Sequence, residues 1–225
     1  GLNCDLNCVM CQQKHISHVK LSKEFYESLE KFLPEIEEIS MSGGEFLAIK
    51  EAKDFFMNFD FKKHKQVKFN FITNGQLLTE NIIKRMIEHC NFVNISIDSG
   101  LKETYEEIRK GAKWDLLMKN LEIIAKYKKI FAKKNSNLQI ILSFVVMKKN
   151  FKEIPIFVRI CDKLSFIPQL DWMRGNKPKN DNLLIKGNEK ELEMLFGIVQ
   201  DLKKSKKYIA HLKNIENEII CHLKK

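Results

Sequence analysis

Three of the six cysteines in this 225-residue chain lie within its first eleven residues. Cys4, Cys8 and Cys11 form a C-x3-C-x2-C array. Three thiolates on so short a loop can converge on one soft metal centre, and an iron–sulfur cluster is the usual occupant of such a loop. The alternative is a structural zinc ion, which normally takes four protein ligands and would therefore also need His15 or His18.

Two glycines and a glutamate follow the first predicted strand. Residues 36–42 have the length and the β-branched content of a strand, and this strand runs into Gly43-Gly44-Glu45. Glycines let the backbone approach a ligand closely, and the carboxylate of Glu45 is a hydrogen-bond acceptor. A ligand could therefore approach the backbone at this turn, although two adjacent glycines alone are a weak signal.

A later strand, predicted over residues 92–98, ends in polar residues. Ser96 and Asp98, at positions i and i+2, would project to the same side at the carboxyl end of this strand. Parallel barrels bind their ligands at that end. The alternative is that the S-x-D sequence forms a strand-end turn or a helix cap.

The order of these motifs resembles the radical S-adenosylmethionine (radical SAM) superfamily, in which a [4Fe-4S] cluster binds SAM through its open iron. The cysteine array is followed on successive units by G-G-E, T-N-G and S-x-D. The resemblance implies that Cys4, Cys8 and Cys11 hold the cluster. It also implies that the G-G-E turn binds the ammonium group of SAM, and that Ser96 and Asp98 bind its ribose or methionyl part.

Three further residues are candidates for cofactor binding. Met10 occupies the position before the third cysteine, where the family often has an aromatic residue against the cofactor. Arg109 lies in a Tyr-x-x-Ile-Arg-x-Gly segment that resembles the SPASM/twitch branch of the family, and it could pair with the SAM carboxylate. The alternative for this arginine is a surface pair with Glu106 or Glu107. Ser143 interrupts an apolar strand, and it either faces the barrel lumen and the cofactor or is a satisfied core serine.

Five predicted strands alternate with helices, which predicts an α/β fold. The resemblance makes this fold a partial (β/α)6 TIM-like barrel with parallel strands and outer helices. Because the chain begins at the cysteine loop, we expect the first strand of the barrel to be missing. The barrel core is assigned to residues 1–175, and a lysine-rich, mainly helical C-terminal extension to residues 176–225. The strands are predicted over residues 36–42, 67–73, 92–98, 138–147 and 166–172.

Two of the helices carry clear start signals. Ser22 is a candidate N-cap for a helix that should end before Pro34, and Thr79 is a candidate N-cap for a helix over residues 81–89. The predicted apolar face of the first helix comprises Phe25, Leu29, Phe32 and Leu33.

The chemistry that the resemblance implies is reductive cleavage of SAM to methionine and a 5′-deoxyadenosyl radical, which abstracts a hydrogen atom from a substrate. The SPASM/twitch-like segment favours a peptide or protein substrate, and the alternatives are a tRNA, a sugar or a small metabolite. A reductant such as flavodoxin or ferredoxin would supply the electron. The cysteines of an auxiliary cluster are absent, so we expect either a fragment or an enzyme without such a cluster. The alternatives of another class are an iron–sulfur electron carrier and a SAM-binding protein without catalysis.

The chain has a formal charge of +10, from 39 Lys and Arg against 29 Asp and Glu. The lysines are spread along the chain, which favours solvated helix faces over a nucleic-acid patch. No apolar run approaches the roughly 20 residues that a membrane span requires. Six cysteines are too sparse for a disulfide scaffold, and thiolates that hold a labile cluster suit a reducing compartment, so we expect a cytoplasmic protein.

Overall fold

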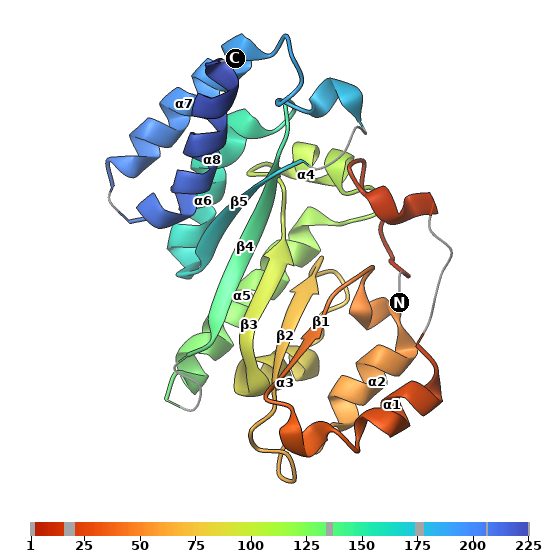
Figure 1. Cartoon of the computed structure of the whole chain (residues 1–225). Coiled ribbons are helices and arrows are strands. Elements are labelled where there is room, and N and C mark those ends of the chain that lie inside the picture. The colour runs from red at the N-terminus through yellow and green to blue at the C-terminus, as the bar shows by residue number, and fades with distance from the viewer. Residues whose placement is uncertain (1–2, 16–20, 134–136, 174–177, 206, 225) are drawn as a thin grey trace. The chain divides into compact units, whose positions relative to one another are not determined.

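The structure is a computed structural model that describes residues 3–15, 21–133, 137–173, 178–205 and 207–224 (Figure 1). The chain divides into two compact units, which we describe separately. Unit 1 comprises Gly1–Asn7, Gln13–Ser96 and Asp115–Ile140. Unit 2 comprises Cys8–Gln12, Ile97–Trp114 and Ile141–Lys225. The predicted domain boundary at residue 175 lies outside the described residues and stays a prediction.

The five strands belong to one sheet in the order β1-β2-β3-β4-β5, and the strand pairs within each unit are parallel. This arrangement confirms the α/β fold class with parallel strands and intervening helices. All five predicted strands are present, with ends that differ by a few residues. The strands are β1 (Glu38–Met41), β2 (Lys68–Thr73), β3 (Cys90–Ser96), β4 (Gln139–Val146) and β5 (Ile167–Trp172).

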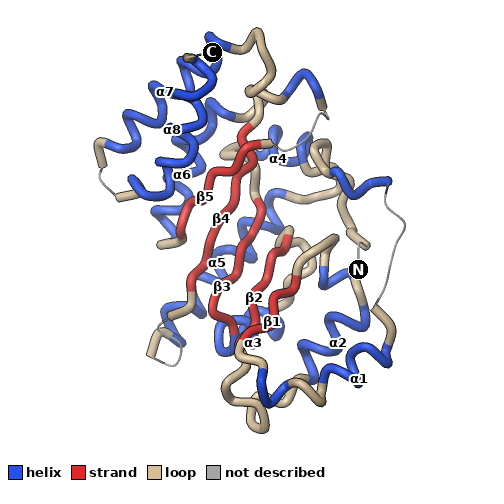
Figure 2. The backbone as a smooth tube through the Cα atoms, in the orientation of Figure 1, coloured by secondary structure: helices blue, strands red, loops and turns tan. Residues whose placement is uncertain are grey.

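Unit 1 places three parallel strands, β1 to β3, beside its helices (Figure 2). The register of β1 on β2 pairs Met41 with Phe71, so the residues after these two strands emerge side by side. Phenylalanines fill the core: Phe71 stacks on Phe46 with ring centroids 4.3 Å apart and meets Phe56 edge-on at 4.7 Å. The helices of this unit are α1 (Lys23–Leu29), α2 (Lys50–Asn58), α3 (Glu80–His89) and most of α5 (Trp114–Phe131).

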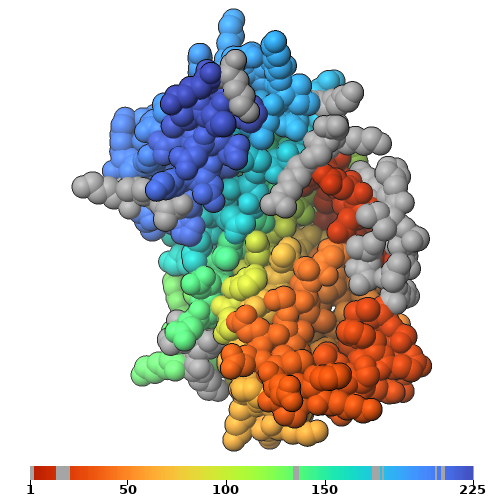
Figure 3. Space-filling model, viewed as in Figure 1, coloured from red at the N-terminus to blue at the C-terminus, as the bar shows by residue number. Residues whose placement is uncertain are grey.

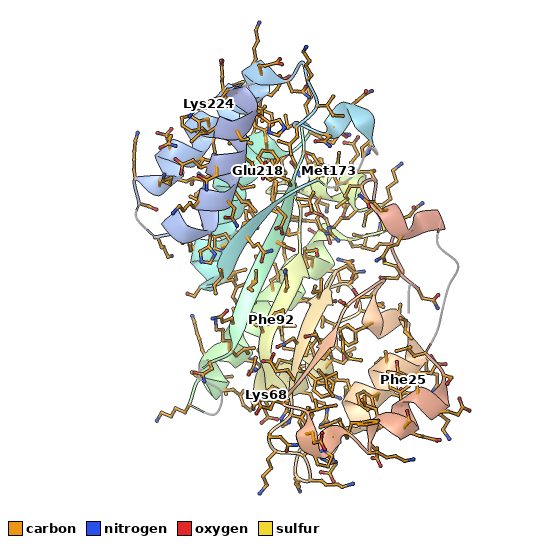
Figure 4. The ribbon with its side chains drawn as sticks, viewed as in Figure 1. Phe25, Lys68, Phe92, Met173, Glu218 and Lys224 are labelled. Atoms are coloured by element: carbon orange, nitrogen blue, oxygen red, sulfur yellow. The ribbon has the colours of Figure 1, made fainter. Side chains whose placement is uncertain are left out.

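Thr79 caps α3 as predicted, since its hydroxyl accepts a hydrogen bond from the Ile82 N–H at 3.4 Å. Ser22 likewise caps α1. The predicted apolar face of α1 is wrong, because the helix ends at Leu29 and the chain then tightens into a short 3-10 turn that contains Pro34. Phe25, labelled in Figure 4, is 44% exposed and Phe32 is 58% exposed.

Unit 2 pairs β4 with β5 in parallel and covers them with helices. Phe144 of β4 packs on Phe157 of α6 (Ile154–Leu164), with ring centroids 5.0 Å apart. The predicted helical tail forms two helices, α7 (Glu189–Lys203) and α8 (Ile209–Leu223), which make up the dark-blue and mid-blue surface in Figure 3. Lys203 and Glu216 join them through an ion pair at 2.6 Å.

A short helix that the sequence did not indicate, α4 (Lys102–Ile108), precedes Arg109 in unit 2. Its start is held by a residue distant in sequence. Glu153 accepts hydrogen bonds from the Ser99 hydroxyl at 2.5 Å, the Gly100 N–H at 3.0 Å and the Thr104 hydroxyl at 2.6 Å. Glu153 therefore ties the loop before α4 to the first turn of the helix, a contact between distant residues that local sequence patterns could not reveal.

The described part of the chain contains no helix that could span a membrane.

Candidate functional site

The six cysteines all lie in the described part of the chain, and none of them forms a disulfide there. Cys4, in unit 1, and Cys11, in unit 2, are exposed, and Cys8, also in unit 2, is half-buried. Three soft thiolate donors are the ligands that an iron–sulfur cluster takes, so the donor set fits this group. Within the ranges that the structure describes, no three Cys, His, Asp or Glu side chains are gathered for a single metal ion.

The zinc alternative stays open. His18 lies outside the described residues, as does the side chain of His15. Two of the other cysteines are buried, as expected for neutral thiols: burial raises the pKa of Cys90 and of Cys161. Cys221 is exposed on α8.

The second half of the cysteine loop is anchored to unit 2. The Val9 N–H donates a hydrogen bond to the Ile108 carbonyl at 2.9 Å. Val9 and Met10 also pack against a buried cluster formed by Ile108, Met147 and Met173, the last of which is labelled in Figure 4. Met10 thus has a packing role inside unit 2, and its predicted contact with the cofactor stays a prediction.

Arg109 is buried between Asp98 and Cys8. Its Nη2 lies 2.5 Å from Oδ2 of Asp98, and its Nη1 lies 4.0 Å from Sγ of Cys8. Burial alone would lower the pKa of Arg109, but the charges of Asp98 and Cys8 outweigh it and raise this pKa. Arg109 is therefore a permanent cation that faces a predicted cluster ligand.

The surface alternative for Arg109 is wrong, because the side chain is only 9% exposed. Glu106 instead accepts a hydrogen bond from the Trp114 N–H at 2.9 Å, and Glu107 pairs with Lys149. The Nε atom of Arg109 is buried without a hydrogen-bond partner among the described residues. A donor that is buried and unpaired costs free energy, so a bound acceptor at this point would be favoured.

Asp98 positions Arg109 through their buried ion pair. The strand ends at Ser96, so the predicted strand to residue 98 is too long, and Asp98 adopts a left-handed backbone with φ of 52°. Its Oδ1 accepts a hydrogen bond from the Val145 N–H at 2.7 Å, and its carbonyl accepts one from the Asn150 side chain at 2.9 Å. Burial raises the pKa of Asp98, and the charge of Arg109 opposes that rise.

The backbone conformation of Asp98 affects the prediction that Ser96 and Asp98 project to the same side of the strand. Because the backbone turns before Asp98, the strand alternation that would put Ser96 and Asp98 on one face does not extend to Asp98. Ser96 ends β3 in unit 1 and is half-buried. Ser143 is 8% exposed on β4, and its carbonyl accepts a hydrogen bond from the Ile97 N–H at 2.9 Å. Contact of Ser96 or Ser143 with SAM stays a prediction.

Glu45 of the G-G-E turn is buried in unit 1 and fully hydrogen-bonded. It accepts bonds from the Thr73 hydroxyl at 3.0 Å, the Asn74 N–H at 2.7 Å and the Leu47 N–H at 3.3 Å. Burial raises the pKa of Glu45, and these hydrogen bonds oppose the rise. The parallel register that pairs Met41 with Phe71 explains the contact, since it brings the G-G-E and T-N-G turns together.

The same two turns anchor the first half of the cysteine loop. The Glu45 N–H donates to the Asn3 carbonyl at 2.6 Å, and the Asn74 side chain donates to Asp5 at 2.7 Å. Gly43 adopts a φ of 121°, which L-residues rarely take, and it is exposed. Gly44 is half-buried. Sequence reasoning missed Thr73, Asn74 and Asp5; the T-N-G motif was the signal for the first two.

The chain matches the family model of the radical SAM superfamily over residues 1–140. Among curated proteins it is similar to a GTP 3′,8-cyclase of Aliarcobacter butzleri, with 34% identity over 134 residues, which cover 56% of this chain and 40% of that protein. It is also similar to an uncharacterized protein of Archaeoglobus fulgidus, with 28% identity over 182 residues, 78% of this chain and 40% of that protein. The chain thus spans about two fifths of the length of these relatives.

Two solved structures share the fold. Streptococcus suis SuiB bound to S-adenosylmethionine superposes with a TM-score of 0.67 at 16% identity, over 92% of this chain and 46% of that chain. The enzyme anSMEcpe, with bound AdoMet and the Kp18Cys peptide, superposes with a TM-score of 0.67 at 23% identity, over 90% of this chain and 59% of that chain.

Proposed function

Because the chain belongs to the radical SAM superfamily, whose members use a [4Fe-4S] cluster and SAM, we propose that it is the cofactor-binding part of a radical SAM enzyme. When bound, the cluster and SAM together supply reductive cleavage of SAM to methionine and a 5′-deoxyadenosyl radical, which takes a hydrogen atom from the substrate. The observation that carries the proposal is the family match over residues 1–140, which contain the C-x3-C-x2-C array.

We propose that some residues of this chain bind the cofactors and that others fix the shape of the site. We propose that Cys4, Cys8 and Cys11 hold the cluster, and that the backbone of Gly43 and Gly44 meets the ammonium of SAM. The carboxylate of Glu45 is occupied by three donors, which supports a role in fixing the shape of this turn.

Among the described residues of unit 2, Arg109 is suited to bind an anion. Its buried Nε lacks a partner among the described residues, and guanidinium groups pair well with carboxylates. We propose that the Nε of Arg109 meets the SAM carboxylate, while Asp98 pairs with its Nη2.

We propose a peptide or protein as the substrate. Support comes from the SPASM/twitch-like segment around Arg109 and from the fold neighbours, since SuiB has been solved with the precursor peptide SuiA and anSMEcpe with the Kp18Cys peptide. A small anionic metabolite is the second candidate, because a curated relative at 34% identity is a GTP 3′,8-cyclase and this chain carries a charge of +10. A flavodoxin or ferredoxin would supply the electron in either case.

The experiment that tests this proposal traces the abstracted hydrogen atom from the substrate to 5′-deoxyadenosine. The protein is loaded anaerobically with iron and sulfide, then given reductant, SAM and a peptide digest from cells grown in heavy water. Deuterium in the 5′-deoxyadenosine, read by mass spectrometry, would support a peptide substrate. Deuterium transfer from labelled GTP but not from the peptides would contradict the peptide proposal and favour the second candidate.

A further inference from the structure

Unit 1 contains a cavity of about 600 Å³ among α1, α2 and the turn that leads to His64. The helices α1 and α2 lie side by side in Figures 1 and 2. His64 precedes β2, which begins at Lys68, whereas the G-G-E and T-N-G turns follow the opposite ends of β1 and β2. The six residues of β2 span about 20 Å, so the cavity is separate from the turns that anchor the cysteine loop.

Aromatic rings form one wall of the cavity. Tyr26 of α1 lies with its ring centroid 5.2 Å from that of Phe55 on α2, and Phe55 lies 5.7 Å from Phe59. All three rings line the cavity. A volume of this size, with an apolar wall and a few polar groups, is typical of sites for small organic molecules.

The polar part of the lining is acidic, although the chain as a whole carries a charge of +10. The two lysines of the lining are exposed, and each is paired within its own helix: Lys23 with Glu27 at 3.0 Å, and Lys50 with Asp54. This leaves three carboxylates without a lysine partner among the residues that line the cavity: Glu30, Glu51 and Asp60. The lining of this cavity is therefore acidic, whereas the chain as a whole is basic.

Two atoms of the lining residues are buried and lack a hydrogen-bond partner in the described structure. One is Oε2 of Glu51 and the other is Nε2 of His64, a residue only 6% exposed. Burying such atoms unpaired costs free energy that a ligand can recover. The pKa of Tyr26 is raised by burial and then by the charge of Glu51, which fits a carboxylate close to the aromatic wall.

We propose that this cavity binds a small organic cation, namely a primary amine or guanidine on a hydrocarbon stem. The stem packs on the rings of Tyr26, Phe55 and Phe59, and the cation is attracted to their faces. An N–H of the ligand donates to Glu51, and His64 offers a second polar contact. This site uses none of the residues assigned to the cluster or SAM.

The test is calorimetric titration of the purified full chain with 1,5-diaminopentane, Nα-acetyl-lysine amide and, as the neutral control, 1-pentanol. We expect both cations to bind and the alcohol not to bind. Tighter binding of the diamine would identify a free amine as the natural source, and tighter binding of the lysine derivative would identify a side chain of a polypeptide. Absence of binding by both cations, or equal binding by the alcohol, would overturn the proposal.

Glu51→Gln keeps the shape of the side chain and removes its charge, and we expect it to weaken cation binding at least about tenfold, as for the loss of a charge-assisted hydrogen bond. The matched control is Glu193→Gln, an exposed acid on α7, which should leave affinity unchanged. If Glu51→Gln does not fold, Tyr26→Leu tests the aromatic wall and should weaken both cations alike. Unchanged affinity in a folded variant of either kind would refute the site. The titration needs neither cluster nor SAM, so its failure would leave the proposed enzyme function untouched.

Discussion

Arg109 holds its guanidinium 4.0 Å from the Cys8 sulfur while Asp98 pairs with it at 2.5 Å on the other side. Asp98 is in turn fixed by the Val145 N–H and by the side chain of Asn150. All these groups belong to unit 2. A fixed cation is thus built into the same unit as a predicted cluster ligand.

Arg109→Gln should destabilise the protein strongly, because it leaves the fully buried carboxylate of Asp98 without a counter-charge. We expect a loss of about 3–5 kcal/mol in the free energy of unfolding, measured by urea denaturation. The double variant Asp98→Asn with Arg109→Gln should recover part of this loss. Glu107→Gln, which breaks an exposed pair with Lys149, is the control and should change little. Equal stability of the Arg109 and Glu107 variants would refute the buried pair.

Cys8→Ala should abolish the visible absorbance of the reconstituted cluster, since two thiolates remain where three are proposed. Cys221→Ala removes an exposed cysteine on α8 and should leave both absorbance and iron content unchanged. Iron and sulfide analysis of the two variants side by side makes the comparison. A full iron content in Cys8→Ala would show that another residue is the ligand.

The stability of the protein should depend on the protonation of Glu45. Burial raises its pKa above the ordinary 4.5, so the folded state holds the proton more tightly than the unfolded state. Its contribution to stability is complete below pH 4.5 and is lost as the pH rises through the folded-state pKa. Wild type should therefore lose more stability between pH 4.5 and 7 than Glu45→Gln, which cannot titrate. Parallel pH profiles of unfolding free energy would contradict this.

Truncation of Phe56 and truncation of Phe25 should have very different effects on the stability of the protein. Phe56 is fully buried and contacts Phe69 and Phe71, so Phe56→Ala should cost about 3–5 kcal/mol in unfolding free energy. Phe25 is 44% exposed on α1, and Phe25→Ala should change stability by less than about 0.5 kcal/mol. Thermal and urea denaturation of both variants measures the difference. A large loss for Phe25→Ala would mean that its ring is covered in solution.

Local sequence patterns predicted a helix or strand well where its cap, its period or its apolar run lies within the element itself. Thr79 and the apolar residues Ile82, Ile83 and Met86 together define α3, because the cap directly precedes the ten residues that carry the helical period. Strand β4 is evident from its continuous apolar run. The predicted apolar face of the first helix is wrong, because Phe32 fits the helical period but lies beyond the end of α1 and is exposed.

The contacts that support the site could not be predicted, because they join residues far apart in the chain. Glu45 meets Thr73 only through the parallel register of β1 on β2. Asp98 meets Arg109 across α4, a helix whose start depends on Glu153. The motifs therefore indicated which turns belong to the candidate site. Only the contacts between distant residues showed which side chains of these turns already pair with other protein groups.

The most direct measurement is the yield of 5′-deoxyadenosine from SAM in the anaerobically reconstituted, reduced protein, compared with Cys8→Ala prepared in the same way. We expect the wild-type chain to form 5′-deoxyadenosine and methionine, and the variant to form neither. Equal yields from both proteins, or no product from a wild-type chain with a full cluster, would contradict the assignment of this chain as the part that cleaves SAM.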